Sequence, residues 1–584
     1  MSFFKSGIEL PNLAGFRGCM VLTGLLLAGC TVSQQQVQDA ALSQMTVPAM
    51  VSTAKKALDD GRYVEAAHWY QLATQRSDDE ELVKEATQAD YDHEQWQAAL
   101  YSAQRWLQIN PTSQDAHEIA ALSALRLYQL DPAVMHLDAL LSSAYITPAS
   151  GFLQLLPKLE QADTSAALAV LQELCDKYPQ VAEAHYAVAK LAAQTSNQPL
   201  MLQQAQRAHE LSPYWSPAGM LLARAQLAGG NTDAALATGK SVIDNDKTPA
   251  TRVEYAELLF EAEHVDEALQ LLKDIEKDDG DASAAVLFLA QVDLQTGAYQ
   301  SAFDRYSQLM SAGSHVSEAI FGMAQIAERA GSIDNARQLY SRVESGEYAV
   351  PAQIRLAQLI QQQDGIDAAL ASLKQYGEGN PDKNIDMIRA EADLLSASGD
   401  DKGALALYDK AVTAYPDDAP LRLARSFLLV KLNKISEAVK EMRALLAIRP
   451  EDPVVLNALG YTLVDRTGDV REGRELIQHA LQYSPDSGAV LDSMGWAEFK
   501  LGHASVALDY LQRAVKRIID ADLDYHLGEV LWSLKRHDDA MQAWQVGLTH
   551  SPKNPQLLKR IQQAEKQRKT PGKMPDKVRD APAK

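Results

Sequence analysis

The stretch that decides the fold is LDSMGWAEFKLGHASVALDYLQRAV, residues 491–515. Gly502 divides it, and a helix must end and reverse there through a left-handed backbone conformation that glycine adopts without strain. Five residues later stands Ala507, a small side chain suited to a place where two helices approach too closely for a larger one. The stretch therefore predicts two helices joined by a tight turn and packed against each other.

The same arrangement recurs along the chain with a period of about 34 residues. Fifteen positions correspond to Ala507, thirteen of them alanine, and they follow one another in fourteen nearly equal steps. We call them the anchors: Ala66, Ala99, Ala133, Ala167, Met201, Ala235, Ala268, Ala302, Ala336, Ala369, Ala404, Ala438, Gly473, Ala507 and Ala540.

Glycines and prolines recur at fixed positions within the repeat. Glycines five residues before an anchor mark the turn inside a helix pair; they are Gly61, Gly230, Gly297, Gly331, Gly399, Gly468 and Gly502. Prolines twelve residues after an anchor close the second helix, because proline cannot continue it; they are Pro111, Pro179, Pro213, Pro381, Pro416, Pro450, Pro485 and Pro552.

Composition agrees with an all-α chain and excludes some partners. Ala, Leu and Gln are abundant, aromatics make up 7 % of the 584 residues, and alternating Val/Thr-rich segments are nearly absent. The formal net charge of −22 argues against nucleic acid, whose polyphosphate surface requires a basic face.

The phased motif resembles the tetratricopeptide repeat (TPR), over residues 47–561 and most closely over residues 394–552. The resemblance implies a right-handed superhelix, an α-solenoid, of about fifteen helix-turn-helix pairs whose first helices line a concave wall. Repeats are weaker over residues 235–348, where closing prolines are missing and the first-helix glycine is mostly absent.

The N-terminal segment has the features of an export signal. Lys5 and Arg17 precede the apolar run CMVLTGLLLAGC, which is too short to span a bilayer. The run ends in LAGC, which resembles the bacterial lipobox and implies removal of residues 1–29 and lipidation of Cys30. Thr31 follows Cys30, whereas an Asp at this position would resemble an inner-membrane retention signal. We therefore expect the protein to be held at the periplasmic face of the outer membrane.

Two further segments and one thiol complete the organisation. We expect residues 30–46 to be a lipidated tether and residues 562–584, with net charge +4, to be a basic disordered tail. Cys175 lies within an apolar helical pattern, which favours a buried structural thiol over a nucleophile.

The sequence offers no motif for catalysis. It contains no HExxH, CxxC, GxSxG or phosphate-binding GxxxxGK[ST], and its thirteen histidines are scattered singly. We therefore predict no enzymatic activity, no cofactor and no metal site. The remaining alternative is an enzyme with a degenerate site between Ala235 and Tyr348.

The candidate site is the concave wall of the last three pairs. Counting back from the anchors gives the first-helix positions that face away from the second helix, and aromatic and acidic residues alternate there. These residues are Asn457, Tyr461, Asp492, Trp496, Phe499, Tyr525, Glu529 and Trp532.

Exposed aromatics at such positions suit a peptide, because they supply a large contact area at low entropic cost. For Trp496 and Trp532 the alternative is that they fill space between adjacent pairs. The Lys/Asn carboxylate clamp of chaperone-binding relatives is missing, since Asp492, Tyr525 and Glu529 occupy the matching positions.

The lipobox, the repeats and the segment 456–496 together resemble the outer-membrane lipoprotein partners of periplasmic carboxyl-terminal processing proteases. The resemblance implies a non-catalytic adaptor that binds the protease and its substrates, such as peptidoglycan hydrolases. The alternative is a scaffold lipoprotein for exopolysaccharide secretion or for pilus or secretin assembly.

Overall fold

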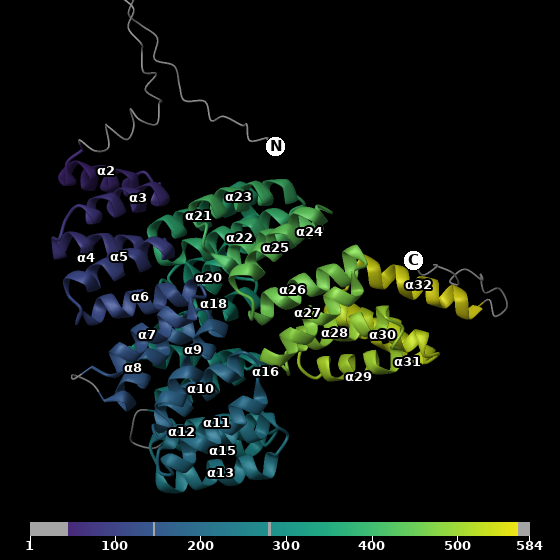
Figure 1. Cartoon of the computed structure of the whole chain (residues 1–584). Helices are drawn as coiled ribbons and strands as arrows, with labels where there is room; N and C mark the ends of the chain where they lie inside the picture. The colour runs from purple at the N-terminus through teal and green to yellow at the C-terminus, as the bar shows by residue number, and fades with distance from the viewer. Residues whose placement is uncertain (1–44, 144–146, 278–281, 570–584) are drawn as a thin grey trace, which may run out of the picture.

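The structure, a computed structural model, describes residues 45–143, 147–277 and 282–569. Its helices succeed one another as antiparallel pairs (Figure 1). The first seven pairs are α2 (Val47–Asp59) and α3 (Tyr63–Gln75), α4 (Glu80–Asp92) and α5 (Trp96–Ile109), α6 (Gln114–Arg126) and α7 (Leu130–Leu141), α8 (Pro148–Gln161) and α9 (Thr164–Lys177), α10 (Ala182–Gln194) and α11 (Gln198–Leu211), α12 (Ser216–Ala228) and α13 (Thr232–Asn245), α14 (Pro249–Glu261) and α15 (Val265–Lys277).

The next eight pairs lead to a single last helix. They are α16 (Ser283–Thr296) and α17 (Tyr299–Ala312), α18 (Val316–Arg329) and α19 (Ile333–Tyr340), α20 (Ala349–Asp364) and α21 (Ile366–Gly379), α22 (Asn384–Ala397) and α23 (Asp401–Ala414), α24 (Ala419–Lys431) and α25 (Ile435–Ile448), α26 (Pro453–Thr462) and α27 (Val470–Tyr483), α28 (Gly488–Lys500) and α29 (Ala504–Ala514), α30 (Ala521–Ser533) and α31 (His537–His550), then α32 (Pro555–Lys569). The all-α prediction of fifteen pairs is confirmed.

Every anchor is the fourth residue of a second helix. The thirteen anchor alanines are fully buried, and Met201 is 7 % exposed. At the glycine anchor the helices approach closely, because a Cβ on Gly473 would lie 2.5 Å from the carbonyl oxygen of Gly460 on the facing helix. The prediction that small anchors allow the two helices of a pair to touch is confirmed.

The predicted turns and stops are also in place. All seven glycines five residues before an anchor have positive φ, between 70° and 92°. Each of the eight prolines lies two residues beyond the end of its second helix. Six other pairs make the same turn with a non-glycine residue at positive φ: Glu94, Tyr128, Ser196, Glu263, Asn433 and Lys535.

Two steps of the repeat carry an extra residue. The step from Ala438 to Gly473 contains a short π-helix, η2 (Leu463–Thr467), which absorbs the insertion at the end of α26. The step from Ala369 to Ala404 contains a 3-10 turn, η1 (Pro381–Lys383).

Three sequence predictions concern regions at the margins of the pattern. The described residues between 235 and 348 form helix pairs like their neighbours, although α19 has only eight residues. Helix α32 runs to Lys569, eight residues into the segment predicted as a tail from residue 562. The signal sequence and Cys30 lie outside the described residues, as does the tail beyond residue 569.

From α10 onward the array curves with its first helices on the inside. First helices of adjacent pairs contact each other, as α10 with α12 and α28 with α30, more extensively than the second helices of the same pairs do. A wall of first helices therefore faces the interior of the superhelix. None of the described helices combines the length and apolar character needed to cross a bilayer.

Helix pairs that are far apart in the sequence also contact each other. In Figure 1 the N-terminal pairs lie beside the pairs around α21–α25, which come much later in the chain. We call this contact the seam: turns inside pairs two to five meet the closing ends of second helices α23, α25, α27 and α29. Its hydrogen bonds include those that join Gln95 to Ala414, Asp163 to Arg449, Ser196 to Asp486 and Gln198 to Arg517.

A buried cation lies at the centre of the seam. The guanidinium of Arg449 is 6 % exposed and pairs with Asp163 and, at 2.7 Å, with Asp452. It also lies 5.3 Å from the ring centroid of Tyr128. Burial lowers the pKa of Arg449, but the two carboxylates outweigh burial and raise it, so the cation is held between them.

Cys175 is a buried thiol, as predicted. It is 4 % exposed, its Sγ lies 3.2 Å from Nδ1 of His185, and burial raises the pKa of the thiol to about 11. A thiol held protonated in this way packs as an apolar group.

Candidate functional site

The eight residues predicted from the sequence lie on one wall, built from the first helices α26, α28 and α30. Helix α26 carries Asn457 and Tyr461, α28 carries Asp492, Trp496 and Phe499, and α30 carries Tyr525, Glu529 and Trp532. These three helices contact each other in order, so the predicted set is brought together.

Trp496 is a packing residue of this wall. It is 6 % exposed, and its indole Nε1 donates a 3.1 Å hydrogen bond to Oδ1 of Asp465 in the π-helix η2. The ring stacks on the imidazole of His526 with centroids 4.1 Å apart, and Lys500 Nζ lies 4.4 Å from its centroid. Of the two roles left open by the sequence, the structure places Trp496 between adjacent pairs.

A buried ion pair lies beneath the wall and was not predicted. Nδ1 of His526 lies 2.9 Å from Oδ1 of Asp492, and their side chains are 5 % and 14 % exposed. Burial lowers the pKa of His526, but Asp492, Asp522 and Asp465 together raise it above its ordinary value. The sequence pattern singles out Asp492 but carries no signal that a histidine of the next pair faces it.

Tyr461 and Asn457 line the α26 end of the wall. Burial raises the pKa of the Tyr461 hydroxyl, and the carboxylates of Asp465 and Asp492 raise it further. The Oδ1 atom of Asn457 is buried and has no hydrogen-bond partner among the described residues. Both side chains are thus polar groups held at a partly buried surface.

The α30 end of the wall is covered by helix α32. Glu529 pairs with Arg560 of α32, and the same guanidinium lies 5.0 Å from the ring centroid of Trp532. Trp532 also packs against Trp544, with centroids 5.6 Å apart. Trp532 and Glu529 therefore hold the last pair to α32, a structural role.

The part of the wall left accessible is aromatic with acidic neighbours. Tyr461, Phe499 and Tyr525 are only partly buried, and acidic side chains lie around them, including Asp465 and Asp522. Within the described ranges, His, Cys, Asp and Glu side chains form no group of three that could hold a metal ion. The arrangement suits binding of an apolar or basic protein surface.

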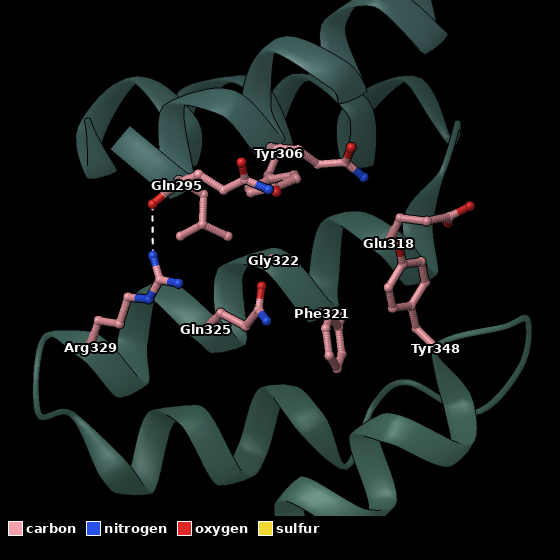
Figure 2. Close-up of a pocket in the computed structure, with 10 residues that line it drawn as sticks. Gln295, Tyr306, Glu318, Phe321, Gly322, Gln325, Arg329 and Tyr348 are labelled. Carbon is pink, nitrogen blue, oxygen red and sulfur yellow. Dashed lines mark hydrogen bonds between the residues drawn. The ribbon is translucent and has the colours of Figure 1, made fainter. Parts of the chain in front are cut away.

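A second surface lies on the same inner wall and was not predicted. Two adjoining pockets lie over α16, α18 and α20, around Phe321, Gln325 and Arg329, and Figure 2 shows residues that line one of them. Phe321 and Gln325 stand fifteen and eleven residues before Ala336, as Asp492 and Trp496 stand before Ala507. Their spacing from the anchor is therefore the sequence signal that points to this surface.

Three segments of the chain match models of a known repeat family. Models described as "Tetratricopeptide repeat" match residues 255–314, 395–460 and 493–555. A TPR repeat-containing protein of Pseudomonas aeruginosa is 35 % identical over 214 residues, which cover 37 % of this chain and 36 % of that protein. Tetratricopeptide repeat protein 21B of Homo sapiens is 29 % identical over 168 residues, 28 % of this chain and 12 % of that protein.

Two solved structures are also similar. The Cut9–Hcn1 hetero-tetramer of the APC/C has 13 % identity and a TM-score of 0.32, over 91 % of this chain and 99 % of that chain. A thermophilic TPR protein of Thermus thermophilus has 21 % identity and a TM-score of 0.29, over 31 % of this chain and 98 % of that chain.

Proposed function

We propose that this tetratricopeptide repeat protein is a non-catalytic adaptor, anchored to the periplasmic face of the outer membrane by a lipid on Cys30. Its inner wall binds a periplasmic carboxyl-terminal processing protease and the protease's substrates, among them peptidoglycan hydrolases. The repeats themselves indicate binding of other proteins. The lipid anchor and the identity of the partners are our proposal.

The observation that carries the binding role is the partly exposed aromatic surface of Tyr461, Phe499 and Tyr525. Aromatic side chains suit such a role, because they dominate the energy of many protein interfaces. Here they lie on adjacent first helices of one wall, so a single partner segment can reach them together.

The lipid on Cys30 supports the adaptor role, because it restricts binding to the membrane surface. Two or more acyl chains would hold the body at the membrane, since each buried methylene contributes about 0.8 kcal/mol. A protease and a substrate that bind the same body then meet at a high effective concentration, without any new contact between them.

Deleting the gene tests this function against the alternative of an assembly scaffold. If the chain is the adaptor, full-length peptidoglycan hydrolases accumulate in the deletion strain, as measured by immunoblotting, and the intact gene restores their turnover. Unchanged hydrolase levels together with loss of a surface polymer or a pilus would contradict the adaptor and support the scaffold.

A substitution at Cys30 tests the lipid attachment. Cys30→Ala in the full chain should leave the signal sequence uncleaved or release the protein from outer-membrane fractions. A Cys30→Ala protein that is processed normally and remains in those fractions would contradict lipid anchoring.

A further inference from the structure

The N-terminal end of the seam joins the turn between α4 and α5 to the end of helix α23 (Figure 1). The side-chain amide of Gln95 donates a 3.0 Å hydrogen bond to the carbonyl oxygen of Ala414, and the backbone N–H of Gln97 donates one of 3.3 Å to Oδ2 of Asp417. Gln97 is the second residue of α5, so its N–H has no acceptor within its own helix. Its bond to Asp417 therefore reports whether this end of the seam is closed.

A carboxyl group without a partner lies at this contact. Glu94 is the residue before Gln95 and adopts φ of 58° in the turn between α4 and α5. Its Oε2 atom is buried and accepts no hydrogen bond within the described residues. An ionised carboxylate is costly to bury unless a donor or a cation compensates its charge. The closed seam therefore favours the neutral, protonated form of Glu94.

Three further carboxyl groups act on Glu94 from the other side of the seam. They belong to Asp418, which precedes α24, to Asp386 of α22 and to Asp382 of the 3-10 turn η1. Together with Glu94 we call them the carboxyl cluster. Burial and the charges of these three carboxylates raise the pKa of Glu94 to about 7, and burial also raises the pKa of Asp418. A negative charge on Glu94 is thus repelled by its neighbours.

The cations near the carboxyl cluster are already engaged. Arg126 of α6 opposes the rise in pKa, but it donates a 3.0 Å hydrogen bond to the carbonyl oxygen of Gln161, and its guanidinium lies 5.4 Å from the ring centroid of Trp96. Arg389 of α22 lies 3.9 Å from Asp386. Neither guanidinium bonds to the buried Oε2 atom, so a proton is the group that can neutralise it.

Two other titratable side chains at this contact do not produce the same pH dependence. Burial raises the pKa of Tyr415 to about 12, so its hydroxyl stays protonated. Burial lowers the pKa of His93, whose ring stacks on Tyr63 with centroids 4.6 Å apart. Because the closed seam disfavours charged His93, protonation of this ring in acid would favour the open seam, which is the opposite direction.

Opening this end of the seam would return Glu94 to water and to its ordinary pKa of 4.5. The closed seam has the higher pKa, so its contribution to closure is fully present below pH 4.5 and is lost as the pH rises through about 7. The difference between 4.5 and 7 corresponds to a closing equilibrium that is about 300-fold less favourable at alkaline pH than in acid.

We propose that the carboxyl cluster makes the N-terminal end of the seam a proton-sensitive contact, closed when Glu94 is protonated and open when Glu94 is ionised. The first helix pairs are then held against the later turn of the superhelix in acid and released at alkaline pH. The contact around Arg449 is independent of this change, because a guanidinium keeps its charge throughout. The inference goes beyond the proposed function and depends on neither the lipid nor the identity of a partner.

Hydrogen exchange of the Gln97 amide in the purified protein measures the opening. Exchange is followed by mass spectrometry with fragmentation to single residues at pH 5.5, 6.5 and 8, and is corrected for the intrinsic rate at each pH. We expect the protection of this amide to fall at least about tenfold between pH 5.5 and pH 8.

Two substitutions at Glu94 remove the ionisable group. Glu94→Gln keeps the size of the side chain, and Glu94→Gly introduces the residue that stands at this place in seven other pairs and accepts a positive φ. In both variants the protection of Gln97 should change less than about threefold over the same range. Asp90, a buried carboxyl bonded to Ser102 at 2.8 Å, remains in both, so a pH dependence that originated there would persist.

Glu263→Gln is the matched control. Glu263 stands five residues before an anchor, as Glu94 does, and adopts φ of 66°, but its side chain is exposed. This variant should keep the full change in protection at Gln97. Circular dichroism checks that every variant folds.

Three results would overturn the proposal. They are equal protection of Gln97 at pH 5.5 and pH 8 in the unaltered protein, the full pH dependence in both Glu94 variants, and loss of the dependence in Glu263→Gln. These measurements involve no partner protein, whereas hydrolase turnover in the deletion strain tests the adaptor. Failure of one therefore leaves the other result readable.

Discussion

At the scale of a single residue, the exposed fraction of a side chain shows whether it packs against its neighbours or is available to a partner. Trp496 and Phe427 are aromatic residues at the same place in their repeats, eleven residues before Ala507 and Ala438. Trp496 is 6 % exposed and bonded to Asp465, whereas Phe427 is 50 % exposed. Sequence position alone could not distinguish them, because burial here depends on His526 of the next pair.

The two aromatics should therefore respond differently to truncation. Trp496→Ala removes a buried indole together with its hydrogen bond to Asp465 and its stacking on His526, so we expect a loss of about 3–5 kcal/mol. Phe427→Ala should cost less than about 1 kcal/mol. Hydrogen exchange of helix α28 and thermal unfolding measure the difference, and equal losses in both variants would show that Trp496 is not a packing residue.

The His526–Asp492 pair makes stability depend on pH. Because the folded pKa of His526 is raised, its contribution is fully present below the ordinary value of 6.5 and is lost as the pH rises through the folded pKa. We expect the melting temperature of the unaltered protein to fall between pH 6 and pH 9 by more than that of Asp492→Asn, which lacks the carboxylate. Parallel pH profiles of the two proteins would refute the ion pair.

For the helix pair as an element, the repeat was predictable because its determinants are local. Anchor, turn and stop all act within one helix pair, so the sequence locates fifteen pairs with correct phase. The π-helix η2 was not predictable in this way: its insertion is one residue long, and the sequence does not say whether a turn or a helix absorbs it.

The turns inside pairs carry unequal backbone strain. Glu263 is exposed and adopts φ of 66°, a conformation that costs a non-glycine residue about 1–2 kcal/mol. Glu263→Gly should raise stability by about 0.5–1 kcal/mol, once the greater flexibility of unfolded glycine is counted. Gly502→Ala, at φ of 91°, should lower stability by about 1–2 kcal/mol. Melting temperatures that move in the same direction in both variants would contradict this explanation.

For the molecule as a whole, the repeats do not predict the seam. Each pair specifies its packing on the next one, but Asp163 and Arg449 are 286 residues apart. Their meeting depends on the summed curvature of all the intervening pairs, which local patterns do not give. The buried guanidinium between two carboxylates closes this turn of the superhelix.

Removing the cation should open the seam. Arg449→Ala leaves Asp163 and Asp452 buried without a counter-charge, which typically costs about 3–5 kcal/mol. We expect the radius of gyration measured by small-angle X-ray scattering to increase. Arg443→Ala is the matched control, because Arg443 lies on α25, which Arg449 directly follows, is 51 % exposed and pairs with Glu472 at the surface. An Arg449→Ala protein as compact as the control would show that the seam does not hold the superhelix closed.

Photocrosslinking in cells tests the proposal that the inner wall binds periplasmic proteins at the outer membrane. Benzoylphenylalanine would replace Tyr525 on the inner wall or Phe303, a 45 % exposed residue on the second helix α17. Tyr525 should crosslink to a carboxyl-terminal processing protease or its hydrolase substrates, identified by mass spectrometry, and Phe303 should not. Crosslinks to those proteins from Phe303 and none from Tyr525 would be incompatible with binding at the inner wall.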